Sequence, residues 1–443
     1  MKAFLRSLYL SNRFFQLAAL NAVLFVVGYF YTTFAAIAEV LLLVFGVLLL
    51  IDFLLLYRIN GIQARRTLPQ RFSNGDENPV SISITNNYAF SALVKLIDEI
   101  PSQFQQRDFN FSFLMKSGEE LVKKYELRPT ERGEYHFGSI LVFAASQIGL
   151  LRRKYAFEEP AMIPVYPSFI QMRKFEMYAI SNRLTDIGIK KIRRIGHTME
   201  FDQIKEYVQG DDVRSINWKA TARSQSLMVN QFQDERSQQV INVIDMGRVM
   251  KMPFDGLHLL DYAINTSLVL ANISLIKDDK AGLVTFSHNS STVVKPERRR
   301  VHIQRIQDAL YNLETNFLES DFERLIISLR RHINQRSLVM LYTNFETVSS
   351  MKRQLPYLQR IAKDHLLVVV FFQNTELEAF IKDDPENVGE VYTKIVAEKF
   401  NYEKKEIVKA LNRSGIQTIL TPPKELSVNA INKYLELKAR GLI

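Results

Sequence analysis

Two long apolar stretches open the chain, before any regular alternation of apolar and polar residues begins. The first runs from Leu17 to Ala38 and the second from Val40 to Tyr57, and only Glu39 separates them. At a rise of about 1.5 Å per residue, each is long enough to cross about 30 Å of hydrocarbon. Because backbone groups inside lipid must be hydrogen-bonded within helices, the short break predicts a transmembrane two-helix hairpin over residues 1–60.

Basic residues around these stretches predict the orientation of the hairpin. They lie before the first stretch and after the second, at Lys2, Arg6, Arg13, Arg58, Arg65, Arg66 and Arg71. Since basic residues accumulate on the cytoplasmic side, we expect two spans with both termini in the cytoplasm. A cleavable signal peptide is the competing interpretation, but the first stretch is longer than the apolar core of such a peptide. We interpret Asp52, inside the second stretch, as a tolerated or capping carboxylate.

Between residues 61 and 180 the pattern changes to short runs that alternate apolar and polar residues. Such runs, separated by Asn, Gly and Pro, are found at Pro79–Thr85, Leu93–Ile97, Phe109–Phe113 and Ile140–Phe143. Period-two alternation of this kind is typical of antiparallel strands. We therefore expect a small β-sandwich-like domain over residues 61–180, which acts as a spacer or docking surface next to the membrane.

From residue 240 to residue 443, apolar runs alternate with segments of helical spacing. The runs are Val240–Ile244, Ala281–Phe286, Leu338–Tyr342, Leu366–Phe372 and Thr418–Leu420, and the helical segments include Leu257–Ile276, Phe322–Ile333, Val391–Leu411 and Val428–Ala439. Near-continuous apolar strands are typical of a parallel sheet that is buried on both faces. The order predicts an open doubly wound α/β domain with a ligand crevice at the carboxyl ends of its strands, where Asp245, Thr343 and Asn344 fall.

The composition narrows the classes of function. The chain has no cysteine, which excludes disulfides, thiolate nucleophiles and Cys-based metal sites. Its net charge of +10 fits contact with anionic lipid or with nucleic acid, but the basic runs Lys190–Arg194 and Arg298–Arg300 have no interleaved aromatic residues. We interpret these runs as solvated faces and expect the lipid bilayer, not a specific nucleic acid, as a partner.

Residues 181–239, between the two predicted domains, form a charged segment that contains the only tryptophan of the chain. It contains Glu200, Phe201, Tyr207, Gly210, Asp211, Arg214, Asn217, Trp218, Thr221, Arg223 and Glu235. In their order and spacing these residues resemble the signature of the bacterial "domain of unknown function 58" family. The two apolar stretches, Gly133–Gly138, Ile148–Leu151 and the α/β half are also similar to that family. The resemblance extends over almost the whole chain and implies a bacterial inner membrane as its location.

The same resemblance implies a von Willebrand factor A-like fold for residues 240–443 and a working relationship with MoxR-type AAA+ ATPases. Domains of this type hold Mg²⁺ with hydroxyl and carboxylate oxygens. Here the first loop reads Asp245-Met-Gly-Arg-Val249, without the two expected serines, and the later positions are Ser320 and Asn344. We expect a degenerate site at Asp245, Ser320 and Asn344 that does not bind Mg²⁺, with Asp245 capping a helix or pairing with an arginine.

The chemistry of the signature residues allows two interpretations. Arginine and carboxylate side chains pair bidentately, so Asp211, Arg214 and Arg223 can pin this segment to the α/β domain. Alternatively, tryptophan and arginine are favoured at the centre of protein interfaces, and Trp218 then marks a surface for a protein partner.

The motifs of several enzyme classes do not occur in the sequence. It contains no phosphate-binding loop, dinucleotide-binding glycine motif, zinc-protease motif or serine-hydrolase elbow, and His197 and Glu200 have no third metal ligand in view. We therefore expect a membrane-anchored, cytoplasm-facing interaction adaptor without enzyme activity or cofactor, which partners a MoxR-type ATPase in an envelope-related process. The alternative is a metal-dependent A-domain binding protein or an envelope enzyme that uses Asp245. The oligomeric state is not predicted.

Overall fold

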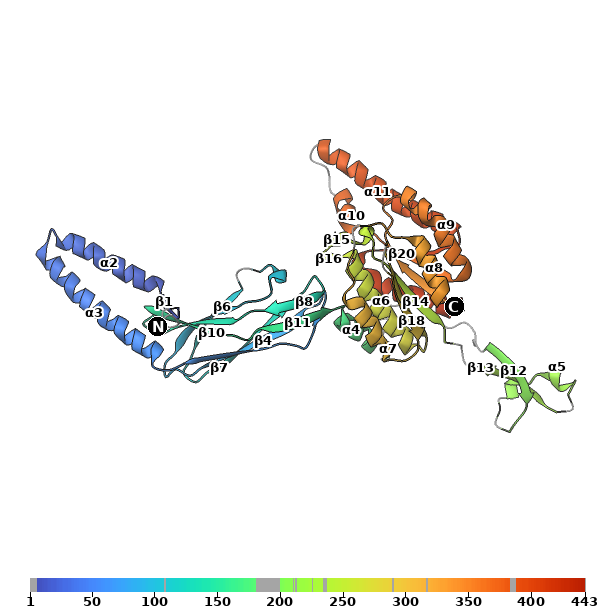
Figure 1. Cartoon of the computed structure of the whole chain (residues 1–443), viewed down its shortest axis with the longest axis horizontal. Coiled ribbons are helices and arrows are strands. Elements are labelled where there is room, and N and C mark those ends of the chain that lie inside the picture. Colours follow the sequence, from blue (N-terminus) through green and yellow to red (C-terminus); the bar gives the residue numbers. More distant parts are fainter. Residues whose placement is uncertain are drawn as a thin grey trace. The chain divides into compact units, whose positions relative to one another are not determined.

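The chain is divided into two compact units, residues 1–166 and 167–443 (Figure 1). The computed structural model describes residues 6–106, 109–180, 200–209, 211, 213–224, 226–233, 237–288, 291–315, 318–382 and 388–442. The boundary lies earlier than the one predicted at residue 180, because helix α4 (Phe169–Ile180) packs against helix α6 (Leu259–Ile276) of the second unit. The amide of Ser168 donates a hydrogen bond of 2.8 Å to Asn265 Oδ1 in α6, just before α4 begins.

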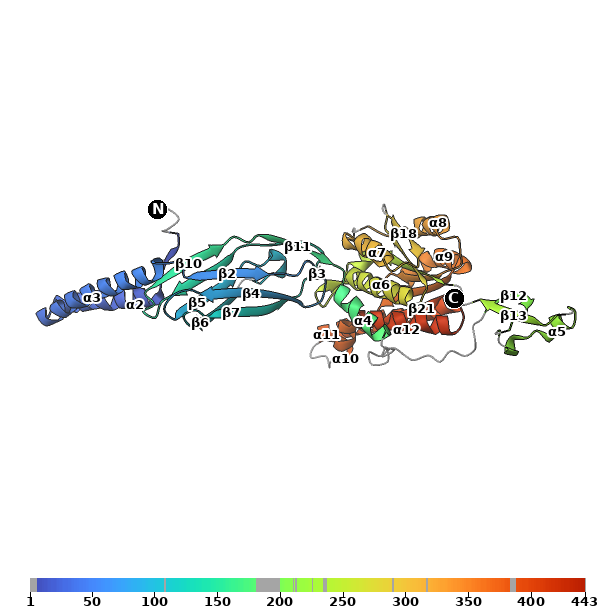
Figure 2. The same ribbon diagram turned by 90° about the horizontal axis from the view of Figure 1, so that it is seen from below.

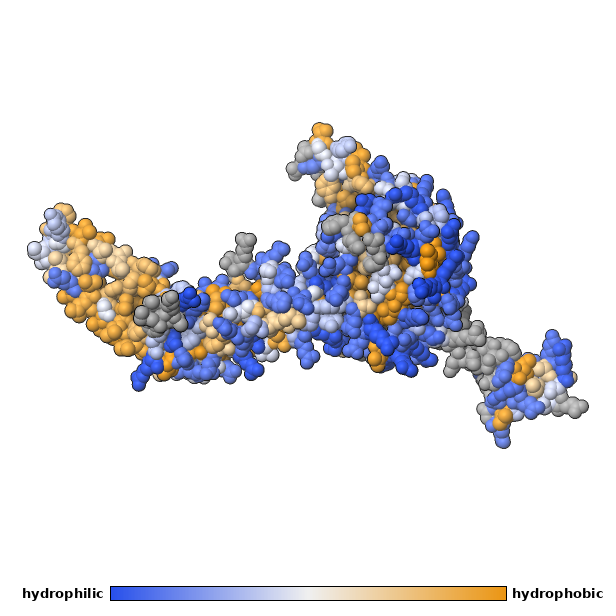
Figure 3. Space-filling view, in the orientation of Figure 1, coloured by the Kyte–Doolittle hydropathy of each residue, from blue (hydrophilic) through white to orange (hydrophobic). Residues whose placement is uncertain are grey.

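Two apolar helices, α2 (Asn12–Gly28) and α3 (Thr32–Tyr57), open the first unit. They run side by side in both ribbon views, and Asn21 Nδ2 donates a hydrogen bond of 3.2 Å to the carbonyl of Ala38 (Figures 1 and 2). Figure 3 shows this part of the unit as a mainly apolar surface. In the most apolar stretch of α3, only 11% of the residues are buried. By length and composition α3 is a candidate membrane span. Helix α6 is also long and apolar enough to cross a membrane, but 89% of it is buried, so it is a core helix.

The connection between the two apolar helices lies at Tyr29–Tyr31, and the predicted break at Glu39 is wrong. Glu39 lies inside α3, since glutamate is a good helix former and one exposed carboxylate does not end a helix. Gly28 ends α2 instead. A Cβ atom at Gly28 would lie 2.7 Å from the amide nitrogen of Ala35, so glycine permits the close approach of the helices at this point.

Asp52 attaches α3 to the β-rich part of the first unit. Its carboxylate is fully buried and accepts hydrogen bonds from the amides of Leu150 and Leu151, at 2.8 and 2.7 Å, and from Ser146 Oγ. The arginine side chain of Arg153 donates to the carbonyl of Leu56 at 2.7 Å, one turn further along α3. Asp52 is therefore a structural anchor between the helix and the loop before β10, a role that the sequence pattern did not predict.

The strands of the first unit form three sheets, with the orders β1-β10-β9-β5-β6, β2-β4-β7 and β3-β11-β8. Their bounds are β1 Leu8–Leu10, β2 Ile62–Thr67, β3 Phe72–Ser73, β4 Asn78–Asn86, β5 Ala92–Asp98, β6 Asn110–Met115, β7 Glu120–Leu127, β8 Gly133–Phe137, β9 Ile140–Ala145, β10 Leu151–Phe157 and β11 Ala161–Tyr166. Ile82 and Ile84 of β4 share one buried cluster with Val94 of β5 and Val142 of β9. Two sheets thus pack face to face around a common core, as the alternating pattern predicts.

Arg66 does not lie at a membrane surface, contrary to its use in the orientation argument. It lies on the inward face of β2, four residues after the buried Ile62, where side chains of a strand return to the same side. There it forms an ion pair with Asp98, and the two side chains are 1% and 0% exposed. Tyr125 OH also donates to Asp98, and burial, followed by the charge of Asp98, raises the pKa of Tyr125.

The second unit is built on a six-stranded sheet of order β18-β17-β14-β19-β20-β21. Its strands are β14 Gln239–Asp245, β17 Lys280–Phe286, β18 Ser291–Glu297, β19 Leu338–Tyr342, β20 Leu366–Phe372 and β21 Gln417–Thr421. All neighbouring pairs are parallel except β17 and β18. The chain begins in the middle of the sheet, builds one edge and then the other, which is the order of a doubly wound sheet with a crevice beside its first strand.

Helices cover both faces of this sheet. Besides α4 and α6 they are α7 His302–Tyr311, α8 Phe322–His332, α9 Val348–Asp364, α10 Thr375–Lys382, α11 Val388–Arg413 and α12 Leu426–Ala439. Val240 and Ile244 of β14 belong to one buried cluster with α6 and α12, whereas Ile241 and Val243 belong to a second cluster with α8, α9 and α11. Burial on both faces explains why β14, β19 and β20 read as continuous apolar runs.

Candidate functional site

The first candidate site is a hollow of about 190 Å³ at the carboxyl ends of β14 and β19. Because these strands are parallel neighbours, Asp245 at the end of one lies beside Thr343, which follows the other. Asp245 is 1% exposed, and its Oδ2 accepts a hydrogen bond of 2.6 Å from Thr343 Oγ1. Its Oδ1 accepts from the amide of Gly247 at 2.8 Å and from Ser320 Oγ. The structure thus brings together Asp245, Ser320 and Thr343; the sequence analysis placed Thr343 at this crevice but did not count it among the degenerate metal-site residues.

Among the residues that the structure describes, the partners of Asp245 are Gly247, Ser320 and Thr343, and none of these contacts is a helix cap or an arginine pair. The cap of α8 is Asp321, which accepts from the amides of Glu323 and Arg324, and Arg248 pairs with the exposed Glu319 at 3.1 Å. Burial raises the pKa of the Asp245 carboxyl, while its hydrogen bonds from Ser320, Thr343 and Gly247 act in the opposite direction. The Asp245 carboxylate thus accepts hydrogen bonds from three groups of the protein at the carboxyl edge of the sheet.

The donor set at this hollow does not fit a hard divalent cation. Such ions prefer several carboxylate or carbonyl oxygens, whereas Asp245 is the one buried carboxylate among the residues that line the hollow. Glu319 and Glu346 also line it, but both are exposed, and Glu319 pairs with Arg248. At the third predicted position, Asn344 Oδ1 accepts a hydrogen bond of 2.6 Å from the ammonium of Lys404, which adds a positive charge. Within the part of the chain that the structure describes, no group of three or more His, Asp and Glu residues could hold a metal ion.

The second candidate site is the signature segment, an antiparallel pair of strands, β12 (Glu200–Glu206) and β13 (Met228–Gln233), with the short helix α5 (Trp218–Thr221) between them. Glu200 and Phe201 lie on β12, and Tyr207 follows it. The predicted residues Gly210 and Glu235 lie outside the described residues, as does His197.

Three signature residues hold the segment together from within. Asp211 accepts hydrogen bonds of 3.0 Å from the amide of Val208 and from Lys205 Nζ, and these two donors lower the pKa of Asp211. Asn217 caps α5 by accepting from the amide of Ala220 at 3.0 Å. The amide of Met228 donates to Thr221 Oγ1, also at 3.0 Å. The described partner of Asp211 is thus a lysine of the same segment and not an arginine that would pin it to the α/β domain.

Trp218 is not covered by the residues of this segment. It is 70% exposed, and the nearby Val208 and Val213 are 63% and 64% exposed. Arg214 and Arg223 are also exposed. Three exposed large apolar side chains and two exposed arginines in one short segment have the composition of an interface rather than of a core.

Lys404 is the functional candidate that the sequence pattern did not indicate. It lies in α11, 60 residues after Asn344 in the chain, within a charged helical sequence where one lysine looks like any other. Burial lowers its pKa to about 8, against the opposing effect of Glu346. No local sequence motif indicates that the Lys404 ammonium lies beside Asn344, because this position depends on how α11 packs beside the sheet.

Comparison with known proteins gives one family and one curated relative. The model of the family "Protein of unknown function DUF58" matches residues 203–387, which include Trp218, Asp245, Ser320 and Asn344 but not Lys404. "Uncharacterized protein YeaD" of Bacillus subtilis (strain 168) is 24% identical over 204 residues, which are 43% of this chain and 50% of that protein. The chain thus spans about half the length of this relative.

Solved structures resemble only small parts of the chain. A PapD-like domain of human CEP192 is 13% identical and covers 24% of this chain and 84% of its own, with a TM-score of 0.18. The CARDB domain of a Pyrococcus furiosus protein is 14% identical and covers 24% of this chain and 86% of its own, with the same TM-score. Scores this low carry no argument about the fold, so the likeness to DUF58 proteins over residues 203–387 is the finding that places this chain among known proteins.

Proposed function

We propose that this chain is a membrane-anchored interaction protein, that it faces the cytoplasm, and that the signature segment around Trp218 is its partner-binding surface. The candidate partner suggested by the family resemblance is a MoxR-type AAA+ ATPase. In this proposal α2 and α3 form the transmembrane hairpin in a bacterial inner membrane, and the β-rich part is a spacer above it.

The apolar exposure of α3 supports the membrane part of the proposal. Val40, Leu43 and Leu50 are 66%, 69% and 57% exposed, which is unfavourable in water and favourable in lipid. From Thr32 to Asp52 the helix is about 30 Å long, which matches the thickness of a hydrocarbon core. The burial of Asp52 against the β-rich part marks where the lipid-facing segment ends. Arg58 remains an exposed basic residue directly after the helix, on the side assigned to the cytoplasm.

The observation that carries the interaction proposal is the exposure of Trp218. Asp211, Asn217 and Thr221 form hydrogen bonds within the segment, whereas the Trp218 side chain is 70% exposed and forms no hydrogen bond or ring contact with the residues that the structure describes. Burying a tryptophan against a partner removes a large apolar area from water, and arginines beside it add directional hydrogen bonds. A binding surface accounts for both.

For the second unit we infer a von Willebrand factor A-like fold whose strand-end hollow does not depend on a metal. The alternative, a metal-dependent binding protein or an envelope enzyme that uses Asp245, requires a bound divalent ion. The Asp245 carboxylate already accepts hydrogen bonds from the protein, and the ammonium of Lys404 contacts Asn344. Both observations argue against that alternative. Its direct test is calorimetric titration of the full chain with Mg²⁺ or Mn²⁺, where saturable heat at Asp245 would support the alternative.

The absence of cysteine permits a sharp test of the interaction surface. A Lys219→Cys variant carries a single thiol next to Trp218, to which a photo-crosslinker can be attached in isolated native membranes. We expect a crosslink to the AAA+ ATPase, identified by mass spectrometry, and a loss of this crosslink when Trp218→Ala is added. Lys409→Cys, an exposed position on α11, is the matched control and should give no such product.

Two results would contradict the proposal. If the ATPase crosslinks equally from Lys219→Cys and Lys409→Cys, the labelling is not specific to the signature segment. If it crosslinks from neither position while a direct pull-down still recovers it, the contact lies elsewhere and the signature segment is internal architecture.

A further inference from the structure

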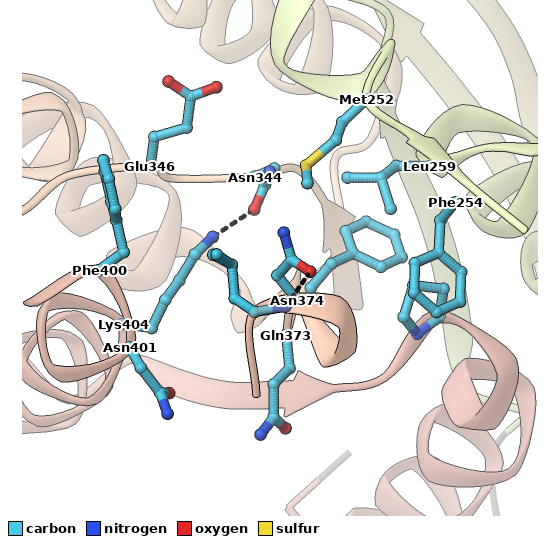
Figure 4. Close-up of a pocket in the computed structure, with 13 residues that line it drawn as sticks. Met252, Phe254, Leu259, Asn344, Glu346, Gln373, Asn374, Phe400, Asn401 and Lys404 are labelled. Atoms are coloured by element: carbon cyan, nitrogen blue, oxygen red, sulfur yellow. Dashed lines mark hydrogen bonds between the residues drawn. The ribbon is translucent and has the colours of Figure 1, made fainter. Parts of the chain in front are cut away.

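A second cavity, of about 260 Å³, opens at the carboxyl edge of the sheet next to the hollow of Asp245. Its walls come from the segments that follow β19 and β20, from the start of α6 and from the middle of α11. Figure 4 shows polar groups of Lys404, Asn344 and Asn374 directed toward the middle of the cavity, with Met252, Phe254 and Leu259 on the far side. In doubly wound sheets, this edge is where ligands bind.

Lys404 places an ammonium group in this largely apolar space. Its only hydrogen-bond acceptor among the described residues is Asn344 Oδ1 at 2.6 Å, and the ring of Phe371 lies 5.8 Å from its nitrogen. An ammonium has three donors, so two of them remain for a ligand. Glu346 is the nearest opposing charge, but it is exposed, and in Figure 4 its carboxylate points away from the ammonium.

The orientation of the two amide side chains is fixed by their partners. Asn344 is 4% exposed and turns its oxygen toward Lys404, so its NH₂ group is left as a donor. Asn374 turns its oxygen to the amides of Glu376 and Leu377, both at 3.1 Å, at the start of α10, so its NH₂ group is also a donor. Lys404, Asn344 and Asn374 thus each carry N–H donors, and the side-chain oxygens of the two asparagines already accept hydrogen bonds. Such a group selects an anion or another strong acceptor.

The rest of the cavity selects an apolar body. Met252, Phe254, Leu259 and Phe400 supply thioether, aromatic and aliphatic surface. A volume of about 260 Å³ is roughly nine times that of a water molecule in the liquid, enough for a ligand of about ten non-hydrogen atoms. An apolar pocket with a few convergent polar groups is the usual form of a small-molecule site.

We propose that this cavity binds a small apolar molecule with one carboxylate group, whose oxygens accept hydrogen bonds from Lys404, Asn344 and Asn374 while its apolar body lies against Met252, Phe254 and Leu259. The inference is independent of the partner surface around Trp218. Lys404 lies outside the region that the family model matches, whereas Asn344, Asn374, Met252, Phe254 and Leu259 lie inside it. The low pKa of Lys404 supports the proposal, because it reports an ammonium that has given up water without gaining a carboxylate partner.

The probe for the test is 3-phenylpropanoate, and 3-phenylpropanamide is its uncharged match. Both are titrated into the full chain in lipid nanodiscs, with the protein labelled at its methionine methyl groups with ¹³C. A Met252→Leu sample assigns the signal of Met252, one of 12 methionines. We expect a saturable shift of this signal with the carboxylate, and binding at least roughly tenfold weaker with the amide, since charge-assisted hydrogen bonds are involved.

Two variants separate this mechanism from general apolar binding. Lys404→Leu should abolish the preference for the carboxylate over the amide, whereas Lys405→Leu, its exposed neighbour on α11, should keep it. Asn374→Asp retains the helix-capping oxygen but replaces the NH₂ donor with a second oxygen, so it should weaken carboxylate binding without loosening α10. No shift of the Met252 signal in the wild type, equal binding of the two probes, an unchanged preference in Lys404→Leu, or unchanged carboxylate binding in Asn374→Asp would overturn the proposal.

Discussion

Replacing Lys404 with methionine should stabilise the second unit, because the wild-type chain holds an ammonium in a poorly solvated place. The difference between the ordinary lysine pKa of 10.5 and about 8 corresponds to about 3 kcal/mol in favour of the neutral amine in the folded state. Methionine keeps the length of the apolar stem but loses the hydrogen bond to Asn344, which is worth about 1 kcal/mol. The expected net gain in the free energy of unfolding is about 2 kcal/mol at pH 7.

The gain should depend on pH in a defined direction. The pKa of Lys404 is lower in the folded than in the unfolded chain, so between pH 8 and 10.5 the unfolded chain binds more protons. The wild type therefore becomes more stable as pH rises through this range. The advantage of Lys404→Met is largest below pH 8 and nearly lost close to pH 10.5, where the lysine is neutral in the folded state and half neutral in the unfolded state.

Scanning calorimetry of the full chain in nanodiscs measures both quantities. At pH 7 a gain of about 2 kcal/mol raises the melting temperature of a unit of this size by about 4–8 °C. At pH 10.5, where the cost of the charge is nearly gone but the hydrogen bond is still lost, the variant should melt no higher than the wild type. The control Lys405→Met changes an exposed lysine one residue away and should shift the unfolding free energy by less than about 0.5 kcal/mol. A destabilised Lys404→Met chain at pH 7, or the same gain at both pH values, would refute the assignment of Lys404 as a desolvated ammonium.

Further predictions concern the other buried groups. Asp52→Ala should lower the unfolding free energy of the first unit by about 3 kcal/mol in urea titrations, because three donors lose their acceptor, whereas Glu39→Ala on the same helix should have little effect. Asp245→Ala should lower the unfolding free energy of the second unit by about 2–4 kcal/mol in the same titrations. Adding about 10 mM Mg²⁺ should not raise the melting temperature of the wild type. A Mg²⁺ site with a Kd of about 0.1 mM would instead stabilise the folded chain by about 2.7 kcal/mol at that concentration. Binding of 3-phenylpropanoate should weaken as pH rises through about 8, when Lys404 loses its proton, and binding of the amide should not change.

The sequence predicted best those strands that the sheet buries on both faces. Leu338–Tyr342 and Leu366–Phe372 coincide with β19 and β20, because nothing but a strand in a covered parallel sheet requires such a run of β-branched and aromatic residues. The edge strand β18 was missed, since none of Ser291–Glu297 is fully buried and its pattern is weak. Helix α4 was also missed. Its sequence carries basic residues among apolar ones, and its role appears only through its packing on α6.

The break between the apolar helices shows the limit of hydropathy alone. Hydropathy marks Glu39 as the interruption, but the chain turns where Gly28 allows close packing and where aromatic residues follow. The polarity of a side chain indicates whether it contacts solvent, whereas the backbone geometry determines where a helix ends. Asp52 makes the same point, because its carboxylate is buried against amides almost 100 residues away, at Leu150 and Leu151.

The strand-end site was predicted in position but not in chemistry. Asp245, Ser320 and Asn344 fall where the order of strands places them, since the carboxyl ends of parallel strands meet at one edge. What converts this edge from a cation site into a candidate anion site is a single contact, Lys404 on Asn344. An asparagine alone is neutral and compatible with either. With the ammonium beside it, its oxygen already accepts a hydrogen bond and a positive charge is added, so a carboxylate ligand is favoured over Mg²⁺. If the Lys404→Leu chain bound Mg²⁺ at the hollow of Asp245 in calorimetric titration, the contact between Lys404 and Asn344 would account for the change in selectivity. If it did not, the hydrogen bonds that the Asp245 carboxylate accepts within the protein would be sufficient to exclude the ion.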